Sequence, residues 1–400
     1  MIEAETPTAT VSFDNLETAF ATKSNSDLEK AYWLFKAMGS NFLVSNGPTI
    51  LNASLKLHLP VIPIIRATLF RHFCGGESIT DCNKTVAALH QSGIGSILDY
   101  SVEGEETEAA FDQTTAELLA TIDRAKGDPS IPFCVFKTTG IARFGCLEAV
   151  SQGGELNASL KQEFSRVKER FHKICERSAM HGVRIFVDAE ESWIQQAIDD
   201  LTDEMMNAFN RGGKTIVFNT IQLYRHDRLA FLKASHQKAV DNGYTLGLKL
   251  VRGAYMEKER ERARQMNYPS PIQPDHASSN RDYDAALEYC IQNIDTISFC
   301  AGTHNEDSCH LLARLMFESG IRHSDQRVWF SQLLGMSDHI SYNLAKAGYN
   351  VAKYVPYGPV KSVLPYLIRR AQENTSIAGQ TGRELNMIKA EKTRRKLAGK

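Results

Sequence analysis

The sequence predicts an α/β protein that is built on a (βα)8 barrel and preceded by a helical region. From residue 94 onward, apolar β-rich runs alternate with helix-length amphipathic segments, as expected of parallel strands buried on both faces. There are eight such runs, which is the number of strands in this barrel. An open doubly wound sheet would fit the first five or six runs almost as well, but it ordinarily has a Gly-rich G-x-G-x-x-G or G-x-x-x-x-G-K-[ST] turn, and none is present. The predicted strands are IGSILDYS (94–101), FCVFKTTG (133–140), VRIFVDAE (183–190), TIVFNT (215–220), YTLGLKLV (244–251), TISFCAGT (296–303), RVWFSQLL (327–334) and NVAKYVP (350–356).

Composition narrows the class of protein further. The chain has 400 residues, of which 42% are hydrophobic, and a formal charge of −1, so it can bury a large core and has no bulk positive charge for nucleic acid. Its eight cysteines contain no C-x-x-C pair and no zinc-type spacing, which predicts a reducing compartment. The first ten residues resemble neither a secretory signal nor a transit peptide, and no apolar run reaches the roughly 20 residues that a spanning helix needs. We therefore expect a cytoplasmic protein with no nucleic-acid partner.

The first 93 residues are predicted to form a helical region. Leu28 to Met38 and Ile79 to Gly93 each carry an amphipathic stripe, and the second ends at a glycine suited to a helix C-terminus. Between them, Leu55 to Ile65 is unusually apolar for a segment that two prolines interrupt. Two interpretations stay open for it, a buried edge of the helical region and a contact with a membrane or a partner.

Residues 94–375 are predicted to form the catalytic barrel, and residues 376–400 a basic C-terminal tail. Inside the barrel region, the segment 150–175 after the second strand reads as a long polar-faced helix rather than a linker. The closing run from Lys389 to Lys400 is basic, and we expect it to be frayed.

The carboxyl ends of the predicted strands carry many polar residues, and the active sites of such barrels are built there. Lys137 and Asp188 emerge directly from apolar runs, so each needs a partner, and we expect them to face each other. An ion pair that only supports the scaffold is the alternative. No H-E-x-x-H pattern argues for a catalytic metal and none is expected, although a ligand set of Asp188, Glu190, Glu191 and His304 stays open.

The stretch from Tyr354 to Asn374 joins a buried strand, a sharp turn and a helix. Pro356 and the Gly358–Pro359 pair are expected to end the strand, and the helix is expected from Val360 onward. It carries adjacent arginines whose planar paired donors suit a carboxylate or a phosphate. The alternative is a solvated basic helix with an Arg369–Glu373 ion pair at i, i+4.

Seven motifs along the chain resemble one family. The set FKTTG, VDAEES, TIQLY, KLVRGAYMEKER, AGTHNED, FSQLLGM and YVPYGPV…YLIRRAQEN, from about Leu98 to Asn374, is similar to the proline dehydrogenases, flavin enzymes that oxidise proline to Δ¹-pyrroline-5-carboxylate. The resemblance implies a distorted (βα)8 barrel with FAD at the carboxyl ends of the strands, and electrons passed on to membrane quinone. Many bacterial members have Arg where this chain has Lys249, so the chain resembles the mitochondrial branch. Its length leaves no room for the aldehyde dehydrogenase domain of the bifunctional members.

The resemblance also implies roles for single residues. The substrate carboxylate would be bound by Arg369 and Arg370, with Lys137 also reaching it and Glu373 holding an arginine in place. Asp188 would be the acid of strand three. Three tyrosines would shape the pocket, one of them packed against the proline ring: Tyr354 at the ring, with Tyr255 and Tyr366. The positions that match the family's cofactor contacts are Gln222, Lys249, Arg252, Gly253, Ala254, Thr303 and His304.

Several functional alternatives remain open at this stage. A hydroxyproline dehydrogenase would use the same site, with a different contact at Tyr354. A Schiff-base aldolase barrel would use Lys137 or Lys249 as the nucleophile and the two arginines as an anion clamp. A barrel that only binds a small ligand is a third reading. The resemblance also leaves open a peripheral place on the inner membrane of a bacterium, or a mitochondrial matrix or inner-membrane protein without its transit peptide.

Overall fold

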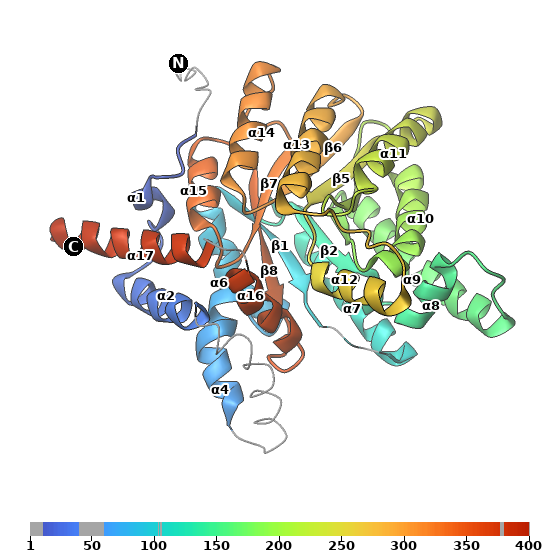
Figure 1. The fold of residues 1–400 in the computed structure, drawn as a ribbon, viewed down its shortest axis with the longest axis horizontal. Helices are drawn as coiled ribbons and strands as arrows, with labels where there is room; N and C mark the ends of the chain where they lie inside the picture. Colours follow the sequence, from blue (N-terminus) through green and yellow to red (C-terminus); the bar gives the residue numbers. More distant parts are fainter. Residues whose placement is uncertain (1–10, 40–59, 103, 105, 377–379, 400) are drawn as a thin grey trace.

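In a computed structural model, described for residues 11–39, 60–102, 104, 106–376 and 380–399, eight parallel strands close into a barrel in chain order. Figure 1 shows the barrel with its helices around it. All eight predicted strands are confirmed. Their bounds are β1 Ile94–Tyr100, β2 Phe133–Lys137, β3 Arg184–Asp188, β4 Val217–Gln222, β5 Leu246–Val251, β6 Ile297–Gly302, β7 Val328–Leu333 and β8 Val351–Tyr357.

Helices follow the strands because the connecting segments carry apolar stripes and capping residues. For example, Asn157 caps α9 after β2, and the same holds before β1, where Ser78 and Asp81 form a capping box at the start of α6. The helices outside the N-terminal region are α7 Glu108–Ala125, α8 Phe144–Ser151, α9 Ala158–His181, α10 Ser192–Phe209, α11 Arg228–Asn242, α12 Met256–Met266, α13 His276–Gln292, α14 Glu306–Glu318, α15 Asp338–Lys346, α16 Leu364–Ser376 and α17 Gln380–Leu397, with a 3-10 turn η2 Thr138–Gly140 after β2.

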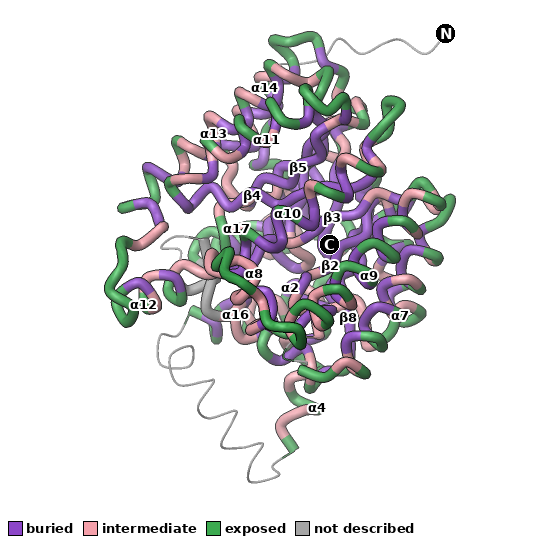
Figure 2. The backbone as a smooth tube through the Cα atoms, turned by 90° about the vertical axis from the view of Figure 1, so that its right-hand side faces the viewer, coloured by how far each residue is buried: buried purple, intermediate pink, exposed green. Residues whose placement is uncertain are grey.

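Aromatic side chains fill the inside of the barrel. Phe133 stacks on Phe186 with ring centroids 4.4 Å apart, and Trp329 meets Phe133 edge-on at 5.2 Å. Tyr354 belongs to the same buried cluster. Its ring lies beside Phe186, which is two residues before Asp188 at the carboxyl end of β3, so Tyr354 lies near the carboxyl ends of the strands. Figure 2 shows the strands buried and the outer faces of the helices exposed. Polar chemistry is therefore confined to the rim above this aromatic layer.

The N-terminal helices and the last helix pack together on one side of the barrel. In Figure 1, α17 lies beside α1 (Leu16–Ala19) and α2 (Asn25–Met38), although some 350 residues separate them in the sequence. A second apolar cluster joins the N-terminal region to the helix after β8, with Phe70 and Phe73 against Val363 and Leu367. Among the described residues, the other N-terminal helices are α4 Val61–Ile65, the π-helix η1 Arg66–Phe70, α5 Arg71–Phe73 and α6 Ile79–His90.

Four expectations about element limits need correction. Pro356 lies inside β8, where it pairs with Asp99 of β1, and α16 begins at Leu364 rather than Val360. The predicted long helix after β2 begins only at α9, because Gly153 turns the chain at φ 71°. The closing basic run is not frayed throughout, since α17 continues to Leu397 and buries side chains against α2.

Part of the apolar segment Leu55–Ile65 lies outside the described residues, as does the side chain of Glu373. The described part forms α4, in which no residue is fully buried and Ile64 is 65% exposed. Among the described helices, none combines the length and apolar character that a membrane span requires.

Candidate active site

The carboxyl ends of four strands bring Lys137, Asp188, Lys249 and Tyr354 together above the aromatic layer, and we call these four residues the Asp188 cluster. The Asp188 carboxylate accepts a hydrogen bond from the Lys137 ammonium at 3.4 Å and another from the Lys249 ammonium. The Lys249 ammonium also donates to the Tyr354 hydroxyl at 2.6 Å. The expected contact between Lys137 and Asp188 is therefore present, as the pairing of these two residues in the β2–β3 register requires.

The positive charges of this cluster keep the carboxyl group of Asp188 ionised. Burial acts to raise the pKa of Asp188, but the ammonium groups of Lys249 and Lys137 outweigh it, so that the pKa lies below its usual range. Asp188 is consequently a carboxylate at neutral pH. Both lysine side chains donate hydrogen bonds to it, so the cluster is fully paired.

Lys249, which the resemblance places among the cofactor contacts, is 5% exposed and donates hydrogen bonds to Asp188 and Tyr354. Its ammonium also lies over the Tyr354 ring, 4.8 Å from the centroid. Lys249 thus holds the tyrosine in place, and its contact with the cofactor stays a prediction.

The two arginines of α16 reach different parts of the rim. The charge of Arg369 lowers the pKa of Tyr255, although burial, the larger effect, raises that pKa well above its usual value. The charge of Arg370 acts on His304. Arg370 is 7% exposed and lies over the Tyr366 ring, 5.2 Å from its centroid. The burial of Arg370 does not fit a solvated basic helix, and adjacent guanidiniums carry the paired donors that suit an anion.

Glu190 ties the ends of β2 and β3 together. Its carboxyl group accepts hydrogen bonds from the backbone N–H of Thr139, at 3.0 Å, and from the Thr139 hydroxyl. Burial raises the pKa of Glu190 to about 7, with Thr139 opposing the shift. Gln222, expected at the cofactor, donates from its amide to the Glu190 carbonyl at 2.7 Å. This acid, two residues beyond the end of β3, is thus bound to the turn that follows Lys137 and has a pKa close to neutral.

A second group of side chains lies at the ends of β5 and β6, and we call Arg252, Thr303 and His304 the Arg252 group. The Arg252 guanidinium donates to the Thr303 hydroxyl at 2.8 Å, to Asn280 at 2.8 Å and to Ser308 at 2.9 Å. Burial is the main reason that the pKa of His304 falls to about 3, and nearby cations lower it further. The imidazole is therefore neutral at physiological pH.

Gly253 and Ala254 connect the Arg252 group to Tyr255. Gly253 has φ 140°, and a Cβ there would lie 2.4 Å from the ring of Tyr224, so only glycine fits this turn. Ala254 is exposed on the turn. The backbone of this turn therefore lies directly against the ring of Tyr224.

The Arg252 group fits the expected flavin in charge and in hydrogen-bonding type. Arg252 presents a guanidinium already held by three neutral acceptors, and His304 is a neutral ring that can donate or accept. Phosphate and ring-carbonyl oxygens accept hydrogen bonds from such groups. No group of three metal-ligating side chains occurs within the part of the chain that the structure describes.

Sequence reasoning missed the residues that hold the loop between β7 and α15. The Lys353 ammonium, fully buried beside Tyr354, donates to the Met336 carbonyl at 2.7 Å and to Asp338 at 2.6 Å. Its signal was present, because a lysine in the apolar run NVAKYVP needs a buried partner. The partner could not be named without the fold.

Comparisons of this sequence with family models and with known proteins point to the same family. The family model described as "Proline dehydrogenase" matches residues 82–383. The carbapenem antibiotics biosynthesis protein CarD of Pectobacterium carotovorum subsp. carotovorum is 35% identical over 82% of this chain and 84% of its own length. Mitochondrial proline dehydrogenase 1 of Dictyostelium discoideum is 31% identical over 94% of this chain and 74% of its own length. Hydroxyproline dehydrogenase of Bos taurus is 31% identical over 96% and 93%.

Among solved structures, proline utilization A (PutA) from Bdellovibrio bacteriovorus, inactivated by N-propargylglycine, matches with a TM-score of 0.72 at 19% identity. The match covers 91% of this chain and 38% of that one, so this chain spans well under half of its length. At this identity the likeness shows the barrel fold alone.

Proposed function

This chain belongs to the proline dehydrogenase family, and we propose that it oxidises L-proline to Δ¹-pyrroline-5-carboxylate with FAD as its cofactor. The observation that best supports this proposal is the Asp188 cluster at the carboxyl ends of the strands, together with Arg369 and Arg370 of α16, the second of which is buried. A small carboxylate bound between these arginines would lie between the Asp188 cluster and the Arg252 group. A ring attached to that carboxylate would then have the cofactor groups within reach.

The residues of the Asp188 cluster would orient the substrate. Two guanidiniums fix the carboxylate by paired hydrogen bonds, and Lys137 adds a third positive group nearby. The Tyr354 ring would pack on the apolar face of proline, and its hydroxyl is held in place by Lys249. Asp188 keeps both ammonium groups fixed, which preorganises the site before the substrate arrives.

The Arg252 group, with Gln222, Gly253 and Ala254, would hold the cofactor. Bound FAD would supply the acceptor for the hydride that leaves the ring carbon beside the nitrogen. The chain's own contribution is to aim that carbon and to keep water out, and the aromatic layer under Tyr354 closes the site from below. The substrate amine must be neutral for hydride to leave, and the cations around the carboxylate favour the neutral form.

We further propose that a quinone reoxidises the cofactor, as the family resemblance implies, and that the exposed α4 helix makes a peripheral membrane contact. The exposure of Ile64 supports the second point.

A second candidate substrate is 4-hydroxyproline, favoured by the 31% identity to the Bos taurus hydroxyproline dehydrogenase. Tyr354 argues for proline, because a phenol beside the ring leaves little space for an added hydroxyl. The two substrates differ at one contact, so a direct comparison separates them.

The test is steady-state turnover of the purified protein, reconstituted with FAD, on L-proline and on trans-4-hydroxy-L-proline with a soluble quinone. Formation of Δ¹-pyrroline-5-carboxylate in step with quinone reduction is expected, with the higher kcat/KM for L-proline. A folded protein that binds FAD and turns over neither amino acid would refute the proposal. A higher kcat/KM for hydroxyproline would make the second candidate the correct one.

A further inference from the structure

Ser337, in the loop between β7 and α15, has an unusual backbone conformation. Its φ of 50° and ψ of 43° place it in the left-handed region, which non-glycine residues rarely adopt. The residue is 1% exposed. Such a conformation persists only where the surroundings determine it.

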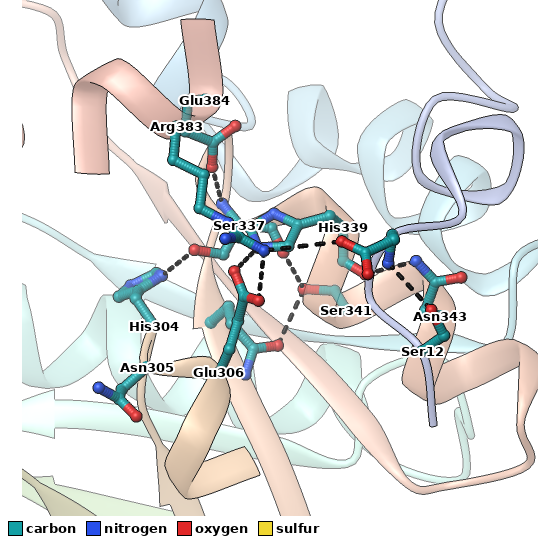
Figure 3. A network of polar contacts seen from close by, with 12 residues as sticks. Ser12, His304, Asn305, Glu306, Ser337, His339, Ser341, Asn343, Arg383 and Glu384 are labelled. Atoms are coloured by element: carbon teal, nitrogen blue, oxygen red, sulfur yellow. Dashed lines mark hydrogen bonds and ion pairs between the residues drawn. The ribbon is translucent and has the colours of Figure 1, made fainter. Parts of the chain in front are cut away.

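Helix capping does not account for this serine. Ser337 is the N-cap residue of α15, a position at which serine ordinarily accepts from the backbone of the first turn. Here the side chain makes no capping hydrogen bond. The hydroxyl instead lies 2.9 Å from Nδ1 of His304, at the end of β6 (Figure 3).

The backbone of the same residue is held by the C-terminal helix. The Ser337 N–H donates to the Glu384 carboxylate at 2.6 Å, and Glu384 is 7% exposed on the first turns of α17 (Figure 3). Lys353 fixes the residues on both sides, through the Met336 carbonyl and the Asp338 carboxylate. The loop is therefore held by hydrogen bonds from the barrel and from α17, and the hydroxyl of Ser337 is directed at His304.

This contact has a chemical consequence for the neutral imidazole of His304. A serine hydroxyl can donate or accept, so this hydrogen bond is compatible with either tautomer of the neutral ring. What the contact at Nδ1 fixes is the plane of the ring and, with it, the direction in which the other ring nitrogen points.

We propose that Ser337, held by Glu384 of α17, is a positioning residue that sets the orientation of the His304 ring for cofactor binding. This rests on the proposed function, because it assumes that the Arg252 group receives FAD. It gives the C-terminal helix, outside the barrel, a part in the site.

Ser337→Gly is the informative variant, because glycine accepts the left-handed conformation and removes only the side chain. The melting temperature should be unchanged or higher. The dissociation constant of FAD, titrated into the apoprotein, should rise roughly three- to tenfold, the size expected for one lost hydrogen bond. The ring ¹⁵N shifts of His304, assigned by its substitution, should change at Nδ1 with or without flavin.

A second pair of variants tests the link to α17. Glu384→Ala removes the acceptor for the Ser337 N–H and should weaken FAD binding in the same direction, whereas Glu384→Gln keeps an oxygen acceptor and should restore it. Glu391→Gln is the matched control, since Glu391 is fully buried on α17 and pairs with Arg394 and Arg395 instead. It should leave the FAD dissociation constant at the wild-type value.

The two proposals fail separately. A wild-type protein that binds no FAD refutes the proposed function, while the His304 shifts still decide whether Ser337 positions the ring. A wild type that binds FAD, with a Ser337→Gly variant of equal affinity and unchanged His304 shifts, overturns the positioning role alone. Equal weakening by Glu391→Gln would mean that any loosening of α17 suffices, and would also overturn it.

Discussion

Substituting Tyr354 by phenylalanine and, separately, by serine distinguishes the two contributions of this side chain. Phenylalanine removes only the hydroxyl, which accepts from the Lys249 ammonium at 2.6 Å. Serine removes the ring as well, and that ring lies beside Phe186 with centroids 6.4 Å apart. The side chain is 7% exposed, so water does not replace either contact freely.

These contacts determine how much stability and how much substrate preference each substitution should remove. A hydrogen bond to a charged group contributes about 1.5–3 kcal/mol, and since Lys249 keeps Asp188 as a partner we expect the lower end for Tyr354→Phe. Loss of a buried ring costs about 3–5 kcal/mol, which is the expectation for Tyr354→Ser. A hydroxyl forced against the ring should cost the substrate about 1–3 kcal/mol, which is roughly 5- to 150-fold in kcat/KM.

The assay is kcat/KM for L-proline and for trans-4-hydroxy-L-proline in the three proteins, beside their unfolding in urea. Wild type and Tyr354→Phe should prefer proline to a similar degree, because both keep the ring. Tyr354→Ser should lose most of the preference, mainly through poorer use of proline. An unchanged ratio in the serine variant, or a lost preference in the phenylalanine variant, would refute the assignment of selectivity to the ring.

Three further outcomes are expected. Arg369→Lys or Arg370→Lys should raise the KM for proline roughly 10- to 150-fold, because the paired donors of a guanidinium contribute about 1.5–3 kcal/mol to binding. The FAD content should not change. Wild-type kinetics in both variants would show that the two arginines do not bind the substrate. Asp188→Asn should lower the free energy of unfolding by roughly 3–5 kcal/mol, since it leaves two ammonium groups without their carboxylate; urea unfolding measures this, and a loss below about 1 kcal/mol would show that the pairs are solvated. Burial raises the pKa of Glu190 from 4.5 to about 7. Between pH 4.5 and pH 7 the folded protein therefore keeps a proton on this carboxyl group that the unfolded chain has already lost. The contribution of Glu190 to the free energy of unfolding is complete below pH 4.5 and falls as the pH rises through 7. Glu190→Gln should flatten that part of the pH dependence of the melting temperature, and a curve that keeps the wild-type slope would place the titration elsewhere.

The strands were predictable because a buried parallel strand has a simple sequence pattern, a short apolar run followed by a polar residue. The same pattern identified Lys137 and Asp188, since a charge at the end of an apolar run needs a partner close by. The helix after β8 was predicted with the wrong start, because Pro359 and the turn after it hold residues 358–363 outside the helix.

The contacts that escaped prediction join residues far apart in the sequence. The hydrogen bond from Lys249 to Tyr354 is one of them, because it crosses the barrel between β5 and β8 and joins residues that are 105 positions apart in the sequence. Glu384 was missed for a similar reason. Its partner, Ser337, lies 47 residues earlier, and no periodicity relates a helix outside the barrel to a loop of the rim.

The central claim, that this chain brings proline to a flavin at the carboxyl ends of its strands, is tested most directly by one anaerobic experiment. The FAD-reconstituted protein is mixed with L-proline without any electron acceptor, and the yellow absorbance of the oxidised flavin is followed in the wild type and in Arg370→Lys. The account predicts that proline bleaches the flavin in the wild type, one Δ¹-pyrroline-5-carboxylate per flavin, and that the variant needs a much higher proline concentration. A flavin that stays oxidised in the presence of saturating L-proline would contradict it.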